Sequence, residues 1–382
     1  MIEFLAGALA VLAARGEEIV AKLEKVTAVP PSVTKHCRRV RDDTKGYLQE
    51  IRDRSRDLQD LRESIARGRL ASSDAEPFIK SYLKDYRDLR RNIDAIEEFF
   101  AGHVVRFSDS DEFLTLASAT IWLEANLPGD PPVAIASTSG YFCTLASLGI
   151  VFAPPNDVQK LLILPDLYHE FGHVLHESSN ILSDKPRFLQ ALADYVYELE
   201  QQARRYSRPL PSDLSGNISF RWLEHWAEEV ACDTLAARLV GPAFGWCNLH
   251  LCIRHAKIYS SSQHPADAAR TRHIFRVLKR CGWAKEVADM ERRWQEYLHL
   301  MSPQKPPNYD DYHPDELFVA VMEDVDAATS SAIPTYVPGS GAICDLVNEA
   351  WVAFLRDPLR YPDWEKPRAE QLWKTMRADL TS

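Results

Sequence analysis

The segment with the clearest chemical pattern is His169-Glu170-Phe171-Gly172-His173, in which three residues separate two histidines. On an α-helix, positions i and i+4 lie one turn apart on the same face, so His169 and His173 can bind one metal ion together. Glu170 lies beside them, where its carboxylate can take a proton from a water that the metal ion acidifies. The pattern predicts a metal-dependent hydrolase, and the alternative interpretation is two ordinary packing histidines on a helix.

The residues that flank the motif favour a helix at this place. Pro165 suits the first turn of a helix, where its missing N–H is not needed. Apolar residues recur at helical spacing through the motif, namely Leu167, Phe171, Val174 and Leu175. We therefore expect the two histidines on a helix that packs one face against the core.

A third ligand is expected from a later helix, because a catalytic zinc ion usually binds three protein side chains and keeps one position for water. A long helix is predicted from Phe220 to Val240, with Ser219 as its N-cap. Glu229 and Asp233 lie one turn apart on this helix. We predict that Glu229 binds the zinc ion and that Asp233 accepts a hydrogen bond from the far nitrogen of a ligand histidine.

The order of these segments resembles a known group of enzymes. A His-Glu-x-x-His helix followed by a later Glu-x-x-x-Asp helix is similar to the gluzincin metallopeptidases, of which thermolysin is a member. The separation of His173 from Glu229 is longer than in thermolysin and closer to the CAAX prenyl proteases and their bacterial membrane relatives. His264-Pro265, with Arg270 after it, resembles the His-Pro…Arg segment of that family.

This resemblance covers roughly residues 160–280 and implies a role for each matching position. It implies that His264 and Arg270 face the substrate or the oxyanion of the transition state. It also implies a zincin-like core, with Glu170 as the base. The chain lacks the membrane-spanning helices of that family, so the resemblance does not imply a membrane-embedded substrate. The zinc ligands that it implies are His169, His173 and Glu229, with Asp233 behind them.

Other residues are alternatives for the third ligand. His176 lies on the same face as His169, but a straight helix carries it too far along to reach the same ion. The segment from His169 to His176 also resembles the thimet oligopeptidase family, whose third ligand is a glutamate at about the distance of Glu198 or Glu200, although the residues around Glu198 match poorly. Glu228 precedes Glu229 directly and is expected to point elsewhere on the helix.

Composition limits the classes of partner. The chain has 382 residues, enough for two domains, and its net charge of −10 argues against nucleic acid or an anionic membrane as a partner. Seven cysteines without a Cys-x-x-Cys pair favour reduced thiols in a cytoplasmic protein. Residues 1–14 are apolar, but Glu3 stands where a signal peptide needs positive charge, so we predict an amphipathic helix there. No stretch has the length of a membrane-spanning helix.

Three regions follow from the periodicity. Residues 1–100 are predicted to form a coiled-coil-like arm of helices at about 2–27, 32–67 and 73–100, and we expect this arm to form a homodimer or bind a partner protein. Residues 101–300 form the expected catalytic domain, and residues 301–382 a helical extension that packs on it. Strands are predicted at 132–137 and 148–153, where the edge of a small sheet can pair with an extended peptide. Residues 160–164 are a third, weaker strand candidate, and the alternative is that they lead directly into the helix of the motif. Further helices are expected at 187–206, 243–258, 266–280, 284–301, 315–332, 342–356 and 364–380.

The sequence as a whole predicts a mostly α (α+β) protein with a small sheet beside the helix of the metal motif. Its predicted function is a zinc-dependent metallopeptidase that acts on a protein or peptide substrate. The loop from Ser302 to Pro314 contains Tyr309, Tyr312 and His313; we expect a plain linker there, and the alternative is a lid over the site. The alternative function is a helical interaction or scaffold protein with a structural or non-catalytic metal site.

Overall fold

The computed structural model is mostly helical and contains a small three-stranded sheet, which confirms the predicted class. Contacts divide the chain into two compact units, residues 1–115 with 135–137, and residues 116–134 with 138–382. The metal motif and every predicted site residue belong to the second unit. The structure describes residues 2–24, 31–71, 74–96, 109–136, 142–153, 161–179, 185–205, 214–255, 258–260, 263–329 and 333–381.

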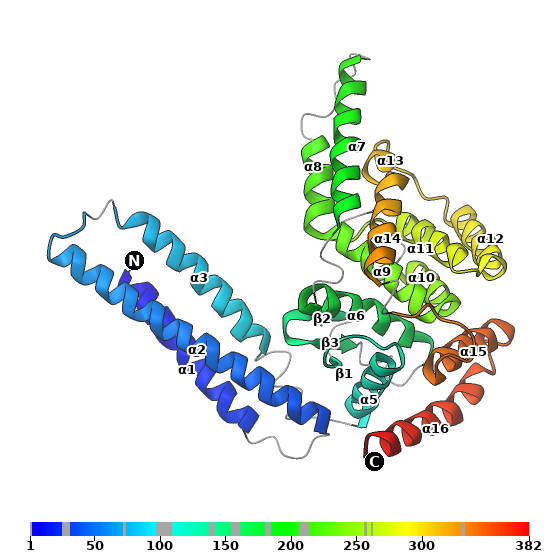
Figure 1. Cartoon of the computed structure of the whole chain (residues 1–382), viewed down its shortest axis with the longest axis horizontal. Coiled ribbons are helices and arrows are strands. Elements are labelled where there is room, and N and C mark those ends of the chain that lie inside the picture. The colour runs from blue at the N-terminus through cyan, green and yellow to red at the C-terminus, as the bar shows by residue number, and fades with distance from the viewer. Residues whose placement is uncertain are drawn as a thin grey trace. The chain divides into compact units, whose positions relative to one another are not determined.

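Three long helices make up most of the first unit: α1 (Ile2–Glu24), α2 (Pro31–Ala66) and α3 (Glu76–Ala95). They lie side by side in alternating directions (Figure 1). Gly16 lets α1 approach α2, since a Cβ there would lie 2.8 Å from Leu48 Cδ2. The three predicted helices are present; residues 25–30 and 97–100, where two of them were expected to end, lie outside the described part. Their buried apolar residues recur every three or four positions and include Leu5, Leu9, Leu12, Val33, Val40, Leu48, Ile51, Leu58, Leu89 and Ile93.

The sheet has the order β1-β3-β2, with strands Val133–Ala136, Cys143–Leu145 and Ile150–Ala153. β2 pairs antiparallel with β3, and Thr144 stands opposite Val151. Of the two alternatives for residues 160–164, the strand is wrong within the described residues and the direct lead into the helix is confirmed, because Leu161–Ile163 forms a short 3-10 helix that continues into α6. A short apolar run does not by itself distinguish a strand from a buried helical turn.

The helix of the third ligand begins earlier than expected. α8 (Leu214–Arg221) continues through a wide π-helical turn (Trp222–Trp226) into α9 (Ala227–Val240), so Ser219 lies inside a helix and is not an N-cap. A π-helical turn adds a residue to the helix and rotates everything after it. The phase of α9 therefore cannot be extrapolated from the residues that precede Trp222. Gly241 ends α9, as predicted, with a φ of 68°.

The other helices of the described chain agree with the sequence patterns within a few residues, with two exceptions. The first is α13, a single turn at Tyr309–Tyr312 inside the loop expected from Ser302 to Pro314. The second is the helix α5 (Asp109–Glu124), which was not predicted, because its own apolar residues lie on all of its sides. Its sequence therefore shows no apolar periodicity of 3.6 residues. The remaining helices are α6 (Leu164–Ser179), α7 (Pro186–Arg205), α10 (Pro242–His255), α11 (Asp267–Arg280), α12 (Ala284–Met301), α14 (Asp315–Thr329), α15 (Ala342–Arg356) and α16 (Tyr361–Thr381).

Helix α9 is the centre of the second unit (Figure 1). All of its residues are buried except Glu228, and it packs against α6, α11 and α14. Apolar residues lie on several sides of α9, and its buried polar residues Asp233, Thr234 and Arg238 have hydrogen-bond partners on neighbouring elements, so neighbours cover the helix all round. In the described residues, no helix combines the length and the apolar character needed to cross a membrane.

Candidate metal centre

The two helices α6 and α9 bring His169, His173 and Glu229 together, as the sequence predicts. One ligand atom from each of these residues lies within 4.8 Å of the other two. Nε2 of His169 is 3.3 Å from Oε2 of Glu229, and Nε2 of His173 is 3.6 Å from Oε1 of Glu229. Tetrahedral zinc with bonds of about 2.0–2.1 Å places its ligand atoms about 3.4 Å apart. The spacing therefore fits one small metal ion between the three side chains.

The close approach of α6 and α9 depends on Gly172, the fourth residue of the motif. A Cβ at this position would lie 2.8 Å from Cα of Cys232 and 2.6 Å from its Sγ. Any larger residue would push the two helices apart, because a backbone atom cannot turn aside. The motif therefore contributes two candidate ligands and also the glycine contact that sets the distance between α6 and Glu229 on α9.

Asp233 lies behind His169, where the sequence predicts it. Its Oδ1 is 3.0 Å from Nδ1 of His169, so the ring turns its Nε2 toward Glu229. Asp233 is fully buried, and Arg270 donates two hydrogen bonds to it, at 2.8 Å from Nε and 2.7 Å from Nη2. Arg270 therefore holds Asp233 in place, and a contact of Arg270 with substrate stays a prediction. The reason is that α11 packs on α9 and presents position 270 to Asp233.

The second ligand histidine has a carboxylate of its own, which the sequence reasoning missed. Oε1 of Glu228 lies 2.7 Å from Nδ1 of His173. The expectation that Glu228 points away from the site is wrong. The helices α6 and α9 cross so closely that α6 contacts two adjacent positions of α9. The other oxygen of Glu228 is 3.8 Å from Nδ1 of His176. His176 itself contacts Lys185 at 3.1 Å and stands outside the ligand cluster.

Glu170, the expected base, is buried beside the ligands. Its carboxylate accepts a hydrogen bond from the hydroxyl of Thr144, which is the middle residue of β2. β2 is an edge strand in the described sheet. Thr144 was not identified from the sequence, because Cys143–Leu145 is too short and too mixed in polarity to read as a strand. The strand edge and the base are therefore joined by a direct side-chain contact.

His264 reaches the cluster from the segment before α11. Its Nδ1 is 2.9 Å from Oε2 of Glu229, while its side chain is 53 % exposed. The ligand histidine His169 is instead buried and stacks on Phe244, with ring centroids 6.4 Å apart. His264 therefore lies at the open side of the cluster, which agrees with the expectation that it faces the site.

The pKa values show how strongly the cluster attracts a positive charge. Burial alone would lower the pKa of His169, but Asp233 and Glu229 outweigh burial and raise this pKa to about 10. Burial alone would raise the pKa of Glu229, but contacts with His169 and His264 hold it well below its usual range. A cation is thus stabilised at this place, whether it is a proton on a ring nitrogen or a metal ion.

The donor set also fits a metal ion chemically. Two imidazoles and one carboxylate are a known ligand set for catalytic zinc. Oε2 of Glu229 is buried and has no well-aligned hydrogen bond within the described chain, and a metal ion would satisfy it. The alternative ligands Glu198 and Glu200 lie on α7 and do not join the cluster.

Comparison with known proteins gives no further assignment. No family model matches the sequence, and neither a curated protein nor a solved structure is found to be similar. The interpretation of the site therefore depends on its own geometry.

Proposed function

We propose that this chain is a zinc-dependent metallopeptidase with a zincin-like core, in which His169, His173 and Glu229 hold the metal ion. The observation that carries the proposal is the convergence of these side chains from two helices. The far nitrogen of each ligand histidine also meets a carboxylate, Asp233 in one case and Glu228 in the other. Such a pairing is typical of metal-binding histidines, because it fixes the tautomer and the orientation of the ring.

Each residue of the cluster has a chemical task in this proposal. A zinc ion held here supplies an acidified water and polarises a carbonyl group. Glu170 takes the proton and passes it to the leaving nitrogen, and the hydroxyl of Thr144 keeps its carboxylate turned toward the cluster. His264 stands at the exposed side, where an N–H donor stabilises a developing oxyanion. Arg270 acts at one remove, since it fixes Asp233.

A peptide is the substrate class that the surroundings favour. Among the described residues, β2 pairs with a strand on one side only, and an extended peptide can add to such an edge through main-chain hydrogen bonds. The side chain of Thr144 in the same strand touches the base. A peptide that pairs with β2 is therefore held close to Glu170, which favours hydrolysis of a main-chain amide over a small-molecule reaction.

Zinc content tests this proposal directly. Purified wild-type protein is expected to contain about one zinc per chain by elemental analysis. Glu229→Ala is expected to lose the metal, because one of three ligands is gone, whereas Glu170→Gln is expected to keep it. Wild-type protein that takes up no zinc after careful reconstitution would refute the metal site. Zinc retained in Glu229→Ala would show that another residue is the third ligand.

Peptide hydrolysis separates the enzyme from the second candidate function, an interaction protein with a non-catalytic metal site. The long helices of the first unit favour that alternative, because paired helices of this length commonly mediate association. Zinc-loaded wild-type protein and Glu170→Gln are incubated with a mixed peptide library. Cleavage by the wild type alone supports the peptidase. Equal zinc content without cleavage by either protein supports the interaction protein.

A further inference from the structure

A second site lies on α11, on the face that points away from Asp233. A pocket of about 440 Å³ opens between α11 and α12, and the segment that leads into α13 closes one end of it. The positions that line it from α11 include Ala268, Arg272, Phe275 and Arg276, whereas Arg270 faces α9. Residues of the metal cluster do not line this pocket. Its role is therefore separate from the proposed hydrolysis and does not depend on it.

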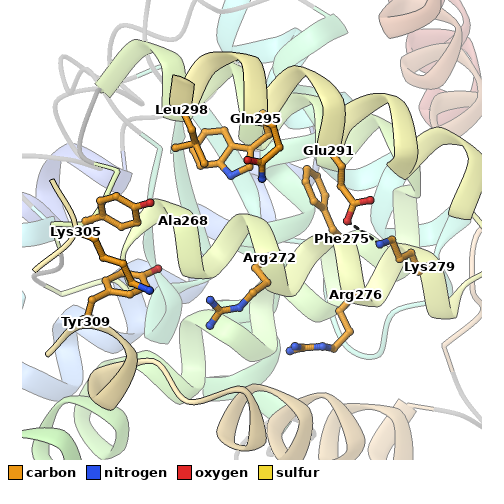
Figure 2. Close-up of a pocket in the computed structure, with 12 residues that line it drawn as sticks. Ala268, Arg272, Phe275, Arg276, Lys279, Glu291, Gln295, Leu298, Lys305 and Tyr309 are labelled. Atoms are coloured by element: carbon orange, nitrogen blue, oxygen red, sulfur yellow. Dashed lines mark hydrogen bonds and ion pairs between the residues drawn. The ribbon is translucent and has the colours of Figure 1, made fainter. Parts of the chain in front are cut away.

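The floor of the pocket is aromatic and its rim is cationic. Phe275, Trp294 and Tyr309 are each no more than 5 % exposed. Four cationic side chains surround this floor, and Glu291 is the single carboxylate among the lining residues. Three carboxylates, those of Asp315, Glu291 and Asp310, pair with these four cations, so the cations exceed their partners by one charge. From one end to the other, Figure 2 shows the cations in the order Lys305, Arg272, Arg276 and Lys279.

Asp315, which stands outside the lining, fixes the two arginines. Its carboxylate oxygens lie 2.9 Å from Nε of Arg272 and 2.8 Å from Nη2 of Arg276. Arg272 also donates to the carbonyl oxygen of His313 at 2.9 Å. The two guanidinium groups therefore need little ordering when a ligand arrives, which favours binding. One nitrogen of Arg276, Nη1, is buried and has no hydrogen-bond partner in the described chain.

The two lysines are more loosely held. Lys279 pairs with Glu291 at 2.7 Å, and Lys305 pairs with Asp310 at 2.7 Å, in positions where all four side chains are well exposed. Exposed pairs of this kind contribute little to stability, so a ligand anion can draw either ammonium group away. The ammonium group of Lys305 also lies 5.1 Å from the ring centroid of Tyr309. Movement of Lys305 toward a ligand therefore opens the end of the pocket where Tyr309 stands.

Tyr309 provides the second, independent observation. It lines the pocket and is 4 % exposed, yet its hydroxyl has no hydrogen-bond partner among the described residues. A buried hydroxyl without an acceptor keeps the full cost of its desolvation, and a ligand acceptor would remove that cost. The unpaired groups of Tyr309 and Arg276 are both donors. Both therefore favour the same kind of ligand, one with negatively charged oxygen atoms.

We propose that this pocket binds a small anion in which a flat apolar group is joined to a carboxylate or phosphate. The anionic group takes hydrogen bonds from the exposed Lys279 and Lys305, and movement of Lys305 away from the ring of Tyr309 uncovers its hydroxyl as a further donor. The flat group packs on the edges of Phe275 and Trp294 that face the pocket. Shape and charge agree on this class, because an apolar cation would meet the cationic rim and a simple inorganic anion would leave the aromatic floor uncovered.

Calorimetric titration of the full chain with phenyl phosphate tests the proposal. Saturable binding of one phenyl phosphate per chain is expected, with benzoate as the carboxylate counterpart. Inorganic phosphate is expected to bind at least tenfold more weakly, and benzylamine not at all. Absence of saturable binding by both aromatic anions overturns the proposal. Equal affinity for phenyl phosphate and inorganic phosphate also overturns it, because the aromatic floor would then play no part.

A pair of matched tyrosine variants locates the ligand. Tyr309→Phe removes one unpaired hydroxyl, so it is expected to keep the thermal stability of the wild type and to weaken binding about tenfold (about 1.4 kcal/mol). Tyr297→Phe is the control, because its hydroxyl on α12 is also buried without a partner but Tyr297 does not line the pocket. Equal affinities of the two variants refute the location. Should Tyr309→Phe fail to fold, Lys305→Gln is expected to weaken binding in its place.

Discussion

Replacement of Gly172 by alanine tests the role of the helix contact beneath the metal centre. The new Cβ would lie 2.6 Å from Sγ, 2.8 Å from Cβ and 2.8 Å from Cα of Cys232. Rotation of the cysteine side chain can relieve the first contact but not the last, so α6 and α9 must separate. Overpacking of this kind costs about 1–3 kcal/mol, from which the higher helix propensity of alanine returns up to about 1 kcal/mol. Because the contact with Cα of Cys232 cannot be relieved by a rotamer change, we take the upper end of that cost and expect a net loss of about 2 kcal/mol.

Urea unfolding followed by tryptophan fluorescence measures this loss. All nine tryptophans occur from Trp122 onward, so their fluorescence reports on the second unit, which contains Gly172. The Gly172→Ala midpoint is expected at a lower urea concentration than that of the wild type. The zinc content of the variant is expected to fall as well, because His169 and His173 move away from Glu229 together with α6.

Gly46→Ala is the matched control. Gly46 lies within α2, and a Cβ there would meet no atom within 4 Å. The same substitution is therefore expected to stabilise the helices of the first unit by about 0.5–1 kcal/mol, measured by circular dichroism. A Gly172→Ala protein with wild-type unfolding midpoint and zinc content would refute the argument, since it would show that α6 and α9 accommodate the extra atom without moving.

Two further perturbations test other contacts of the second unit. Glu228→Gln is expected to lower zinc affinity about 10–100-fold in competition with a chelator, because Nδ1 of His173 loses its anionic partner; unchanged affinity would show that this contact does not orient the ring. Burial lowers the pKa of His273 from its usual 6.5 to about 4. Below about pH 6.5 the unfolded chain binds a proton that the folded chain does not, so the free energy of unfolding falls as the pH falls toward 4. At pH 5 this loss amounts to about 2 kcal/mol, and His273→Gln is expected to show a smaller drop in unfolding free energy between pH 7 and 5; the same drop in both proteins would contradict it.

Local patterns were sufficient for most of the helices. The spacing of apolar residues predicts α1, α2, α3, α11 and α12 because each of these helices buries one face and exposes the other. The same reasoning fails for α5, whose apolar residues surround the helix. It also fails for the start of α8, where Ser219 resembles an N-cap but lies within a helix. An N-cap residue is only a weak local preference. Burial of Leu214 and Ile218 favours a helix that begins before Ser219.

The candidate ligands were found from the sequence because helical spacing fixes which residues share a face. His169 and His173 are one turn apart on any helix, and so are Glu229 and Asp233. Nothing in the sequence fixes the angle at which α6 crosses α9. That crossing decides that Glu228 reaches His173, a contact that no spacing within one segment can show.

The sequence by itself thus determined the helical class and pointed to the candidate ligands, since both follow from periodicity and from the chemistry of single side chains. Tertiary structure alone decided what each ligand touches. It placed Arg270 on Asp233, Thr144 on Glu170, and the unpaired hydroxyl of Tyr309 in the wall of a cationic pocket. The physical reason is that these contacts join distant segments, whose distance and angle are set by packing between helices and not by the residues of either segment alone.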